Sequence, residues 1–103
     1  MNNKALTLLG FAAKAGKLSY GFDSVTSSLK QKKAQLVITA DDISQKTLKE
    51  ATYFARKSGI TVLVLKGVDI QTLTKAIGRK CGIVSVNEKQ FAESLKEEIL
   101  NDQ

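Results

Sequence analysis

The chain of 103 residues is 43% hydrophobic, which is enough for one domain with a modest core and too little for a second domain. It contains no histidine and a single cysteine, Cys81, so an internal disulfide and a histidine–cysteine metal site are excluded. Sixteen lysines and arginines against ten acidic residues give a net charge of +6, which favours a polyanionic partner.

The positive charge is concentrated near the beginning of the chain. Residues 1–33 carry six lysines and one acid, whereas residues 88–103 carry two lysines and five acids. A basic end of this kind attracts RNA, although lysines that only keep a small domain soluble explain the surplus equally well. No segment approaches the roughly 18 apolar residues of a membrane span, and nothing near the N-terminus resembles a cleavage site. We therefore expect a cytoplasmic protein.

The first predicted element is a helix that begins at Asn2 or Asn3 and ends at Gly16. Its apolar residues at positions 5, 8, 9, 12 and 13 recur at the spacing of one helical face. A short extended piece around Leu18 follows. Gly21 then begins a second helix, whose apolar residues at positions 22, 25 and 29 again share one face. We expect each helix to bury one side.

Two short apolar runs in the middle of the chain predict strands. They are "AQLVITA" at residues 34–40 and "ITVLVL" at residues 60–65, and their β-branched composition indicates strands buried on both faces. Between them, Ser44 is the expected N-cap of a helix that runs to about Ser58 and stops at Gly59.

The last third of the chain continues this alternation. Asp69 is the expected cap of a short helix that ends at Gly78, and "GIVSV" at residues 82–86 predicts a third strand. Asn87 with Gln90 predicts a capping box for a final helix. This order is typical of an α/β domain with helices on both faces of a small, largely parallel sheet.

Catalytic motifs are absent from the sequence. The chain has no histidine, its one thiol has no base partner, and its glycines form no nucleotide-binding motif. Asp41 and Asp42 follow a predicted strand, where they could ligate Mg²⁺ or form an ordinary strand-to-helix turn, and the turn is the favoured interpretation. We expect no catalytic residues, no cofactor and no metal.

The start of the helix at Gly21 is the first candidate binding site. A helix N-terminus offers unpaired N–H groups and a positive dipole end to a phosphate, and Gly21 permits close backbone approach. Ser24, Ser27 and Ser28 add hydroxyl donors, and lysines flank the helix at positions 14, 17, 30, 32 and 33. The alternative interpretation is a plain helix boundary with Phe22 in the core and solvated lysines.

The segment "IGRKCGIV", residues 77–84, is the second candidate. It places Arg79 and Lys80 on a glycine-bounded turn between a helix and a strand, where a guanidinium can reach a phosphate. Alone, this segment is typical of a solvated turn in which Cys81 is a small buried hydrophobe. Together, the two candidates favour an anion-binding surface.

Three stretches carry a family resemblance that covers residues 4–92. They are "GKLSYGFDSV", "KKAQLVITADDIS" and "LTKAIGRKCGIVSV". They resemble the kink-turn RNA-binding ribosomal protein family, the class of the archaeal L-seven-Ae and eukaryotic L-thirty-e proteins, and especially its short bacterial members. The resemblance implies an α/β fold, a three-layer α/β/α sandwich around a small mixed four-stranded sheet, with the piece near Leu18 as an edge strand.

The resemblance also implies how RNA is bound. In this family the helix at residues 21–32 would enter the widened major groove at tandem sheared G·A pairs. The loop at residues 79–83 would pack on the protruding nucleotide of the kink, with Ile83 at the apolar position that contacts RNA. Gly21 matches the family glycine, so the overall contour of the site is retained.

Three contact positions depart from the family pattern. Asp23, Ser24 and Ser27 stand where the family usually has asparagine or lysine, glutamate or glutamine, and lysine. An aspartate only accepts hydrogen bonds and cannot donate to guanine O6 or N7. Asp23 could accept from a base amino group, but a helix-capping role is the favoured interpretation.

We therefore expect residues 1–103 to form a single domain that binds a structured, kink-turn-like RNA as a non-enzymatic monomer, with ribosomal RNA as a candidate. The alternative is a protein-interaction module on the same fold, with weakened RNA binding. The predicted RNA-binding residues are Lys17, Gly21, Phe22, Asp23, Ser24, Ser27, Lys30, Lys33, Asp41, Arg79, Lys80, Cys81, Gly82 and Ile83.

Overall fold

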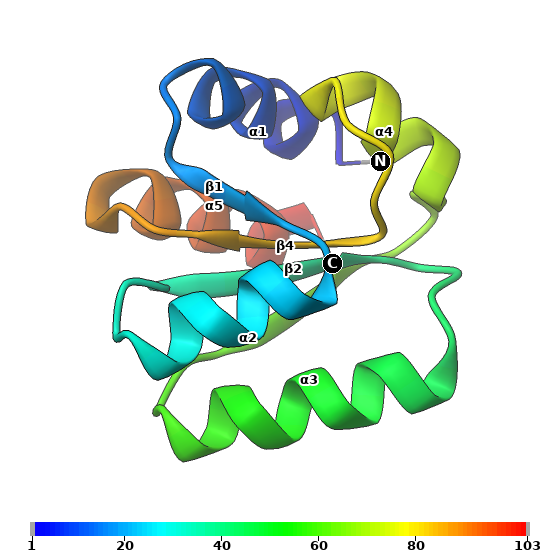
Figure 1. Ribbon diagram of the computed structural model, residues 1–103. Coiled ribbons are helices and arrows are strands. Elements are labelled where there is room, and N and C mark those ends of the chain that lie inside the picture. Colours follow the sequence, from blue (N-terminus) through cyan, green and yellow to red (C-terminus); the bar gives the residue numbers. More distant parts are fainter. Residues whose placement is uncertain (1, 103) are drawn as a thin grey trace.

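The computed structural model describes residues 2–102 and arranges them in three layers, with a four-stranded sheet between two groups of helices (Figure 1). Helices α2 and α3 cover one face of the sheet, and α1, α4 and α5 cover the other (Figure 1). The expected α/β/α sandwich is confirmed. The elements are α1 (Asn3–Lys14), β1 (Leu18–Tyr20), α2 (Phe22–Lys30), β2 (Leu36–Ala40), α3 (Gln45–Lys57), β3 (Val62–Leu65), α4 (Ile70–Ile77), β4 (Ile83–Val86) and α5 (Lys89–Asp102).

The sheet is mixed, with strand order β1-β4-β2-β3. Only β2 and β3 are parallel, while β4 is antiparallel to both β1 and β2. The largely parallel sheet expected from the alternation of elements is therefore wrong, and the mixed sheet implied by the family resemblance is right. The reason is that β3 ends and β4 begins at the same end of the sheet, beside Ala40 and Thr39 at the C-terminal end of β2. A parallel crossover would have to bring the chain back to the opposite end of the sheet, and the connection through α4 does not do so.

Strand β2 is the centre of the core, since all five of its residues are buried. Alternate side chains point to opposite faces of a strand, so β2 contributes to two hydrophobic clusters. Ile38 packs in the cluster that contains Leu95, beneath α1, α4 and α5. Val37 packs in the cluster that contains Val25 and Leu29, beneath α2 and α3.

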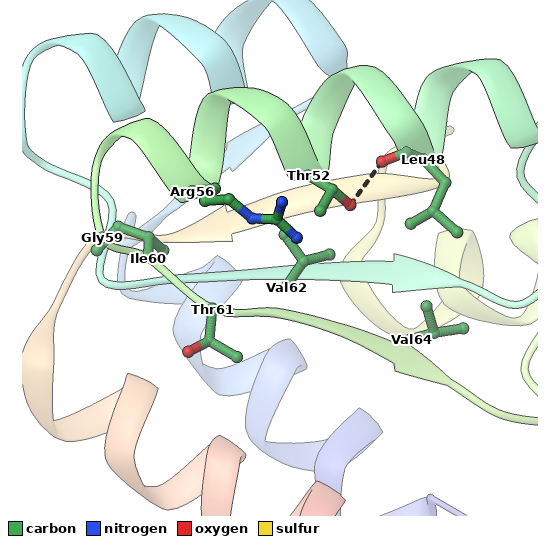
Figure 2. A pocket seen from close by; sticks show the side chains of 8 residues that line it. All are labelled: Leu48, Thr52, Arg56, Gly59, Ile60, Thr61, Val62 and Val64. Atoms are coloured by element: carbon green, nitrogen blue, oxygen red, sulfur yellow. Dashed lines mark hydrogen bonds between the residues drawn. The ribbon is translucent and has the colours of Figure 1, made fainter.

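Strand β3 lies at the edge of the sheet, and this corrects the expectation that residues 60–65 are buried on both faces. Only Leu65 of this strand is fully buried, because no further strand of the described residues covers its outer side. A groove of about 510 Å³ lies beside β3. Figure 2 shows Leu48, Thr52 and Arg56 of α3 among the residues that line it. Arg56 is the one charged residue among those lining the groove.

The predicted caps of α3 and α4 are confirmed. Ser44 accepts a hydrogen bond from the Thr47 amide at 3.1 Å, and Asp69 accepts one from the Thr72 amide at 2.8 Å. The Thr72 amide holds the pKa of the Asp69 carboxyl below its ordinary value of 3.8. Asn2 occupies the N-cap position of α1 without capping it through its side chain, which donates instead to the Lys66 carbonyl at 3.2 Å.

The expected capping box of Asn87 and Gln90 is wrong, because Glu88 caps α5. The Glu88 carboxylate accepts hydrogen bonds from the Phe91 amide at 2.8 Å and from the Gln90 amide at 3.0 Å. The Phe91 amide, and then the Gln90 amide, lower the pKa of Glu88 from its ordinary value of 4.5. Asn87 is one residue too early to reach these amides, and its side chain bonds to Ser19 instead.

Candidate nucleic-acid interface

The two candidate binding segments meet in space. The Gly21 amide donates a hydrogen bond to the Ile83 carbonyl at 2.9 Å. This contact follows from the pairing of β1 with β4, in which Tyr20 lies opposite Val84, so that the start of α2 emerges beside the start of β4. The helix start and the loop before β4 therefore form one continuous surface.

Gly21 gives α2 an unusual beginning. It is the N-cap of the helix at φ 86° and ψ 162°, a conformation that essentially only glycine adopts without strain. No side chain caps this end, and no described residue beyond the two chain neighbours places a heavy atom within 4 Å of the position that a Cβ would occupy. The amides of the first turn are therefore accessible to an anion from outside.

Gly82 holds the loop against the body of the protein. A Cβ at this position would lie 2.7 Å from Ile43 Cγ2 and 3.0 Å from Ile70 Cγ1, so only glycine fits. The Gly82 carbonyl also accepts a hydrogen bond from the Ala40 amide at 2.8 Å. These contacts tie the loop to β2 and to the start of α4, which keeps the preceding residues in place.

The two cations of the loop point to different surroundings. The Arg79 guanidinium carbon lies 4.7 Å from the centre of the Tyr20 ring, a cation–π contact beside Gly21. Lys80 lines a recess of about 450 Å³ together with Asp42 and Asp69 on the α4 side of the loop. Arg79 therefore belongs to the same surface as the start of α2, whereas Lys80 lies at its border.

Cys81 is half-buried between the two segments. Its amide donates a long hydrogen bond to Thr74 Oγ1 at 3.4 Å. Burial raises the pKa of the Cys81 thiol above its ordinary value of 9.0, against the smaller lowering effect of hydrogen bonds from backbone amides, including that of Gly21. The thiol is thus protonated at neutral pH and is a poor nucleophile. Cys81 packs as a partly buried residue against the hydrophobic cluster beneath α1, α4 and α5.

Two predicted contact residues are less accessible than the sequence suggests, and a third, Asp41, is exposed but engages its carboxylate within the protein. The Ile83 side chain is only 4% exposed, since it packs beneath α2 with Val25. The Phe22 ring is half-buried against Phe54, with their centroids 6.3 Å apart. The Asp41 carboxylate accepts a hydrogen bond from the Gly67 amide at 2.9 Å.

The three positions that depart from the family pattern line one groove. This groove has a volume of about 400 Å³ and is lined by Ser19, Asp23, Ser24, Ser27, Ser28, Gln31, Lys33 and Asn87. We call it the serine groove. It runs along the exposed side of α2 and ends near β1 and the start of α5, so it adjoins the surface around Gly21.

Hydrogen bonds at the back of the serine groove fix its shape. The hydroxyl oxygens of Ser19 and Ser28 lie 2.6 Å apart, and the side-chain amide of Asn87 donates a hydrogen bond to Ser19 Oγ at 2.8 Å. The Ser85 hydroxyl donates to Asn87 Oδ1 at 2.9 Å. Ser19 and Asn87 were missed as site residues, because no local pattern signals a bond between residues 68 positions apart.

Asp23 does not cap α2, so the favoured interpretation of this residue is wrong. Gly21 holds the capping position, and Asp23 lies inside the first turn, where its backbone carbonyl accepts from the Thr26 hydroxyl at 3.0 Å. Its exposed carboxylate accepts no hydrogen bond from the described residues. It therefore presents a pure acceptor at the edge of the serine groove.

The lysines of the basic cluster take separate positions. Lys33 lines the serine groove. The backbone carbonyl of Lys17 accepts a hydrogen bond from the backbone amide of Asn87 at 2.8 Å, at the end of the groove that Asn87 lines. Lys30 lies over the Phe54 ring, with Nζ 5.4 Å from its centre. Lys32 has a φ of +60°, in the left-handed region that favours glycine.

The remaining carboxylates form no metal centre. Asp42 accepts a hydrogen bond from the Ile70 amide at 2.8 Å, as Asp41 does from Gly67, so both act as turn residues. Among residues 2–102, no group of three or more histidine, cysteine or acidic side chains is placed to hold a metal ion. The same residues contain no helix that is both long enough and apolar enough to cross a membrane.

The fold and the joined binding segments are those of a ribosomal-type protein. Residues 3–96 match the "Ribosomal protein L7Ae/L30e/S12e/Gadd45 family", and the chain belongs to this family. It is 29% identical over 94 residues to "RNA-binding protein YlxQ" of Enterococcus faecium, covering 91% of this chain and 89% of that protein. The family and this relative are ribosomal-type and RNA-binding proteins, not enzymes, and we regard the present chain likewise as non-enzymatic.

Two solved structures are similar over almost the whole chain. A protein with unknown function from Bacillus halodurans C is 30% identical, with a TM-score of 0.88 over 97% of this chain and 98% of that one. The Giardia lamblia 15.5kD RNA binding protein gives a TM-score of 0.74 over 94% of this chain and 82% of that one. At 18% identity, the second likeness concerns the fold alone.

Proposed function

We propose that this protein binds a structured RNA that contains a kink or bend. The observation that supports this proposal most directly is the hydrogen bond between Gly21 and Ile83, which joins two basic segments into one surface. Family membership and the name of the Enterococcus faecium relative support RNA as the ligand. The proposal describes residues 1–103 as one bacterial, ribosomal-protein-like domain that acts as a cytoplasmic monomer, with ribosomal RNA as one candidate ligand.

Each part of the surface has a distinct task in this proposal. The open first turn of α2 and the lysines near it bind phosphates, which supplies affinity without sequence information. The Arg79 guanidinium, held over Tyr20, donates to a phosphate or to a base edge beside Gly21. The carboxylate of Asp23 accepts from a base amino group, whereas guanine O6 and N7 in a sheared G·A pair offer it nothing.

The test is a titration against a kink-turn RNA and a matched duplex that lacks the G·A pairs, at two salt concentrations. We expect tighter binding of the kink-turn RNA at both concentrations. Arg79→Ala should weaken this binding about 10- to 150-fold, because a charged hydrogen-bond donor contributes about 1.5–3 kcal/mol. Lys96→Ala, which removes an exposed charge from α5 in the other layer, is the matched control.

The other outcomes of this titration are equally informative. Equal and strongly salt-sensitive binding of both RNAs would reduce the interaction to nonspecific attraction by the basic surface. Absence of binding would favour the protein-interaction alternative. In that alternative Asp23, Asp41 and Asp42 would face the partner protein. It gains little from the structure, since Asp41 and Asp42 already accept backbone hydrogen bonds and, of these three, only Asp23 presents an unengaged carboxylate.

A further inference from the structure

The outer face of α3 carries a lysine stripe interrupted by an exposed aromatic ring. We propose that this face is a second RNA-contact surface, on which an unpaired nucleotide stacks on Tyr53 while Lys46, Lys49 and Lys57 bind neighbouring phosphates. The proposal rests on the proposed function and extends it, because the RNA held at Gly21 would continue across α3. We call these four residues the α3 stripe.

The spacing of the stripe places its members on one side of the helix. Positions 46, 49, 53 and 57 are three, four and four residues apart, which matches the 3.6-residue turn and places them on one side of α3. Leu48, Thr52 and Arg56 lie on the side that lines the groove beside β3 (Figure 2). The lysines are exposed, and the stripe is about 16 Å long at 1.5 Å per residue. Glu50, the one acid of α3, lies four residues after Lys46 and three before Tyr53 on the same side, so three lysines and one acid give this face a net charge of +2.

Tyr53 is held in an orientation suited to stacking. It is 58% exposed, one of three large apolar residues so placed among the described residues. The Phe54 ring meets it edge-on, with the centroids 5.3 Å apart and the planes at 74°. Lys57 Nζ lies 5.2 Å from the centre of the Tyr53 ring. A ring fixed at its edge, near a cation and open to water, is the arrangement on which unpaired bases stack.

A chain of aromatic rings connects the stripe with the surface around Gly21. Phe22, the residue after Gly21, packs on Phe54 at 66°, and Phe54 packs on Tyr53. The ammonium of Lys30 lies over Phe54 between α2 and α3. The two helices lie on the same side of the sheet (Figure 1), so a single RNA can contact both without passing around the molecule.

The chain contains two tyrosines and no tryptophan, which allows both surfaces to be observed in one protein. Tyr20 lies beneath Arg79 at the Gly21 surface, and Tyr53 lies on α3. Protein labelled with 3-fluorotyrosine gives two ¹⁹F signals, and the Tyr53→Phe variant assigns them. The probes are a kink-turn RNA with a single-stranded extension and the same RNA without it. We expect the Tyr20 signal to shift with both RNAs and the Tyr53 signal to shift only with the extended one.

Affinity measurements test the same proposal independently. Tyr53→Ala should weaken binding of the extended RNA about tenfold, a typical loss for one stacked base, whereas Tyr53→Phe, which keeps the ring, should bind as the unchanged protein does. Replacing Lys46, Lys49 and Lys57 by alanine should reduce the slope of log K, where K is the association constant, against the logarithm of the salt concentration by about two in magnitude. Each contact to a single-strand phosphate accounts for about 0.7 of this slope. The control replaces Lys4, Lys75 and Lys96, which removes the same charge from the opposite layer.

Three results would separate the possibilities. An unchanged Tyr53 signal with the extended RNA, while Tyr20 responds, would overturn the second surface and leave the proposed function intact. Equal losses from the two lysine triples would also overturn it, since they would show only long-range attraction. If neither signal responds and no RNA binds, the proposed function fails as well.

Discussion

Among the residues of the interface, Gly21 has the backbone conformation that most strictly requires glycine. We expect Gly21→Ala to lower the free energy of unfolding by about 1–3 kcal/mol, the strain of a side chain in a glycine-only conformation. Clash with distant parts of the fold does not contribute, because no described residue beyond the two chain neighbours places a heavy atom within 4 Å of the new Cβ. Urea unfolding measures the stability change, and an RNA titration of the folded variant measures the effect on binding.

Gly78 supplies the matched control for this substitution. It also has open space around its Cβ position, but its φ of 79° and ψ of 12° lie in the left-handed helical region that other residues can occupy. Gly78→Ala should therefore cost less, about 1 kcal/mol. Equal losses at the two glycines would show that ψ at Gly21 has no special importance.

At the scale of a single element, α5 depends on one carboxylate at its start. Hydrogen bonds from the Phe91 and Gln90 amides lower the pKa of Glu88, so the folded state favours the charged form. The stability that Glu88 contributes is fully present above pH 4.5, the ordinary pKa of a glutamate. It is lost as the pH falls through the lower pKa that Glu88 has in the folded state. Acid should therefore weaken the start of α5.

Replacing Glu88 by glutamine tests this cap. We expect Glu88→Gln to lower the melting temperature at pH 7 and to flatten its decline below pH 4.5, because the titrating group is gone. Glu97→Gln, an exposed substitution in the middle of the same helix, is the control. Melting curves recorded from pH 7 to pH 3 provide the comparison, and identical pH profiles for both variants would contradict the role assigned to Glu88.

At the scale of the whole molecule, the two hydrophobic clusters share β2 and should unfold together. Leu29 lies in the cluster beneath α2 and α3, and Leu95 lies in the cluster beneath α1, α4 and α5. Both are almost completely buried, so each leucine-to-alanine change should cost about 2–5 kcal/mol. Because both clusters pack on one sheet, either change should shift the whole unfolding transition.

Two probes can verify this cooperativity. Far-ultraviolet circular dichroism follows all helices, while the ¹⁹F signal of Tyr53 follows α3 alone. We expect coincident urea transitions from both probes for Leu29→Ala and for Leu95→Ala. Separate transitions in either variant would mean that the layers unfold independently.

The helices and the central strand could be predicted because local patterns specify them. Ser44 and Asp69 cap their helices as predicted, and the apolar run at 34–40 became the buried strand β2. The direction of β4 could not be derived from periodicity, since a strand has the same pattern in either orientation. The family resemblance, rather than the pattern, indicated the mixed sheet.

The site was predictable only in outline. Gly21 and Arg79 lie on one surface as the resemblance implied, but the packing of Arg79 on Tyr20 joins residues with no common motif. The serine groove likewise depends on the distant pair Ser19 and Asn87. Asp23 was assigned to capping because aspartate is common at N-caps, but Gly21 already holds that position.

Lys32 stands at the end of α2 in a backbone conformation that suits glycine better than lysine. A glycine would adopt its φ of +60° freely, whereas a lysine there is strained by about 1 kcal/mol. Folding alone would therefore favour glycine at the end of α2. A lysine at this position therefore costs some stability and adds a positive charge at the end of α2, beside Lys33 and near Lys30.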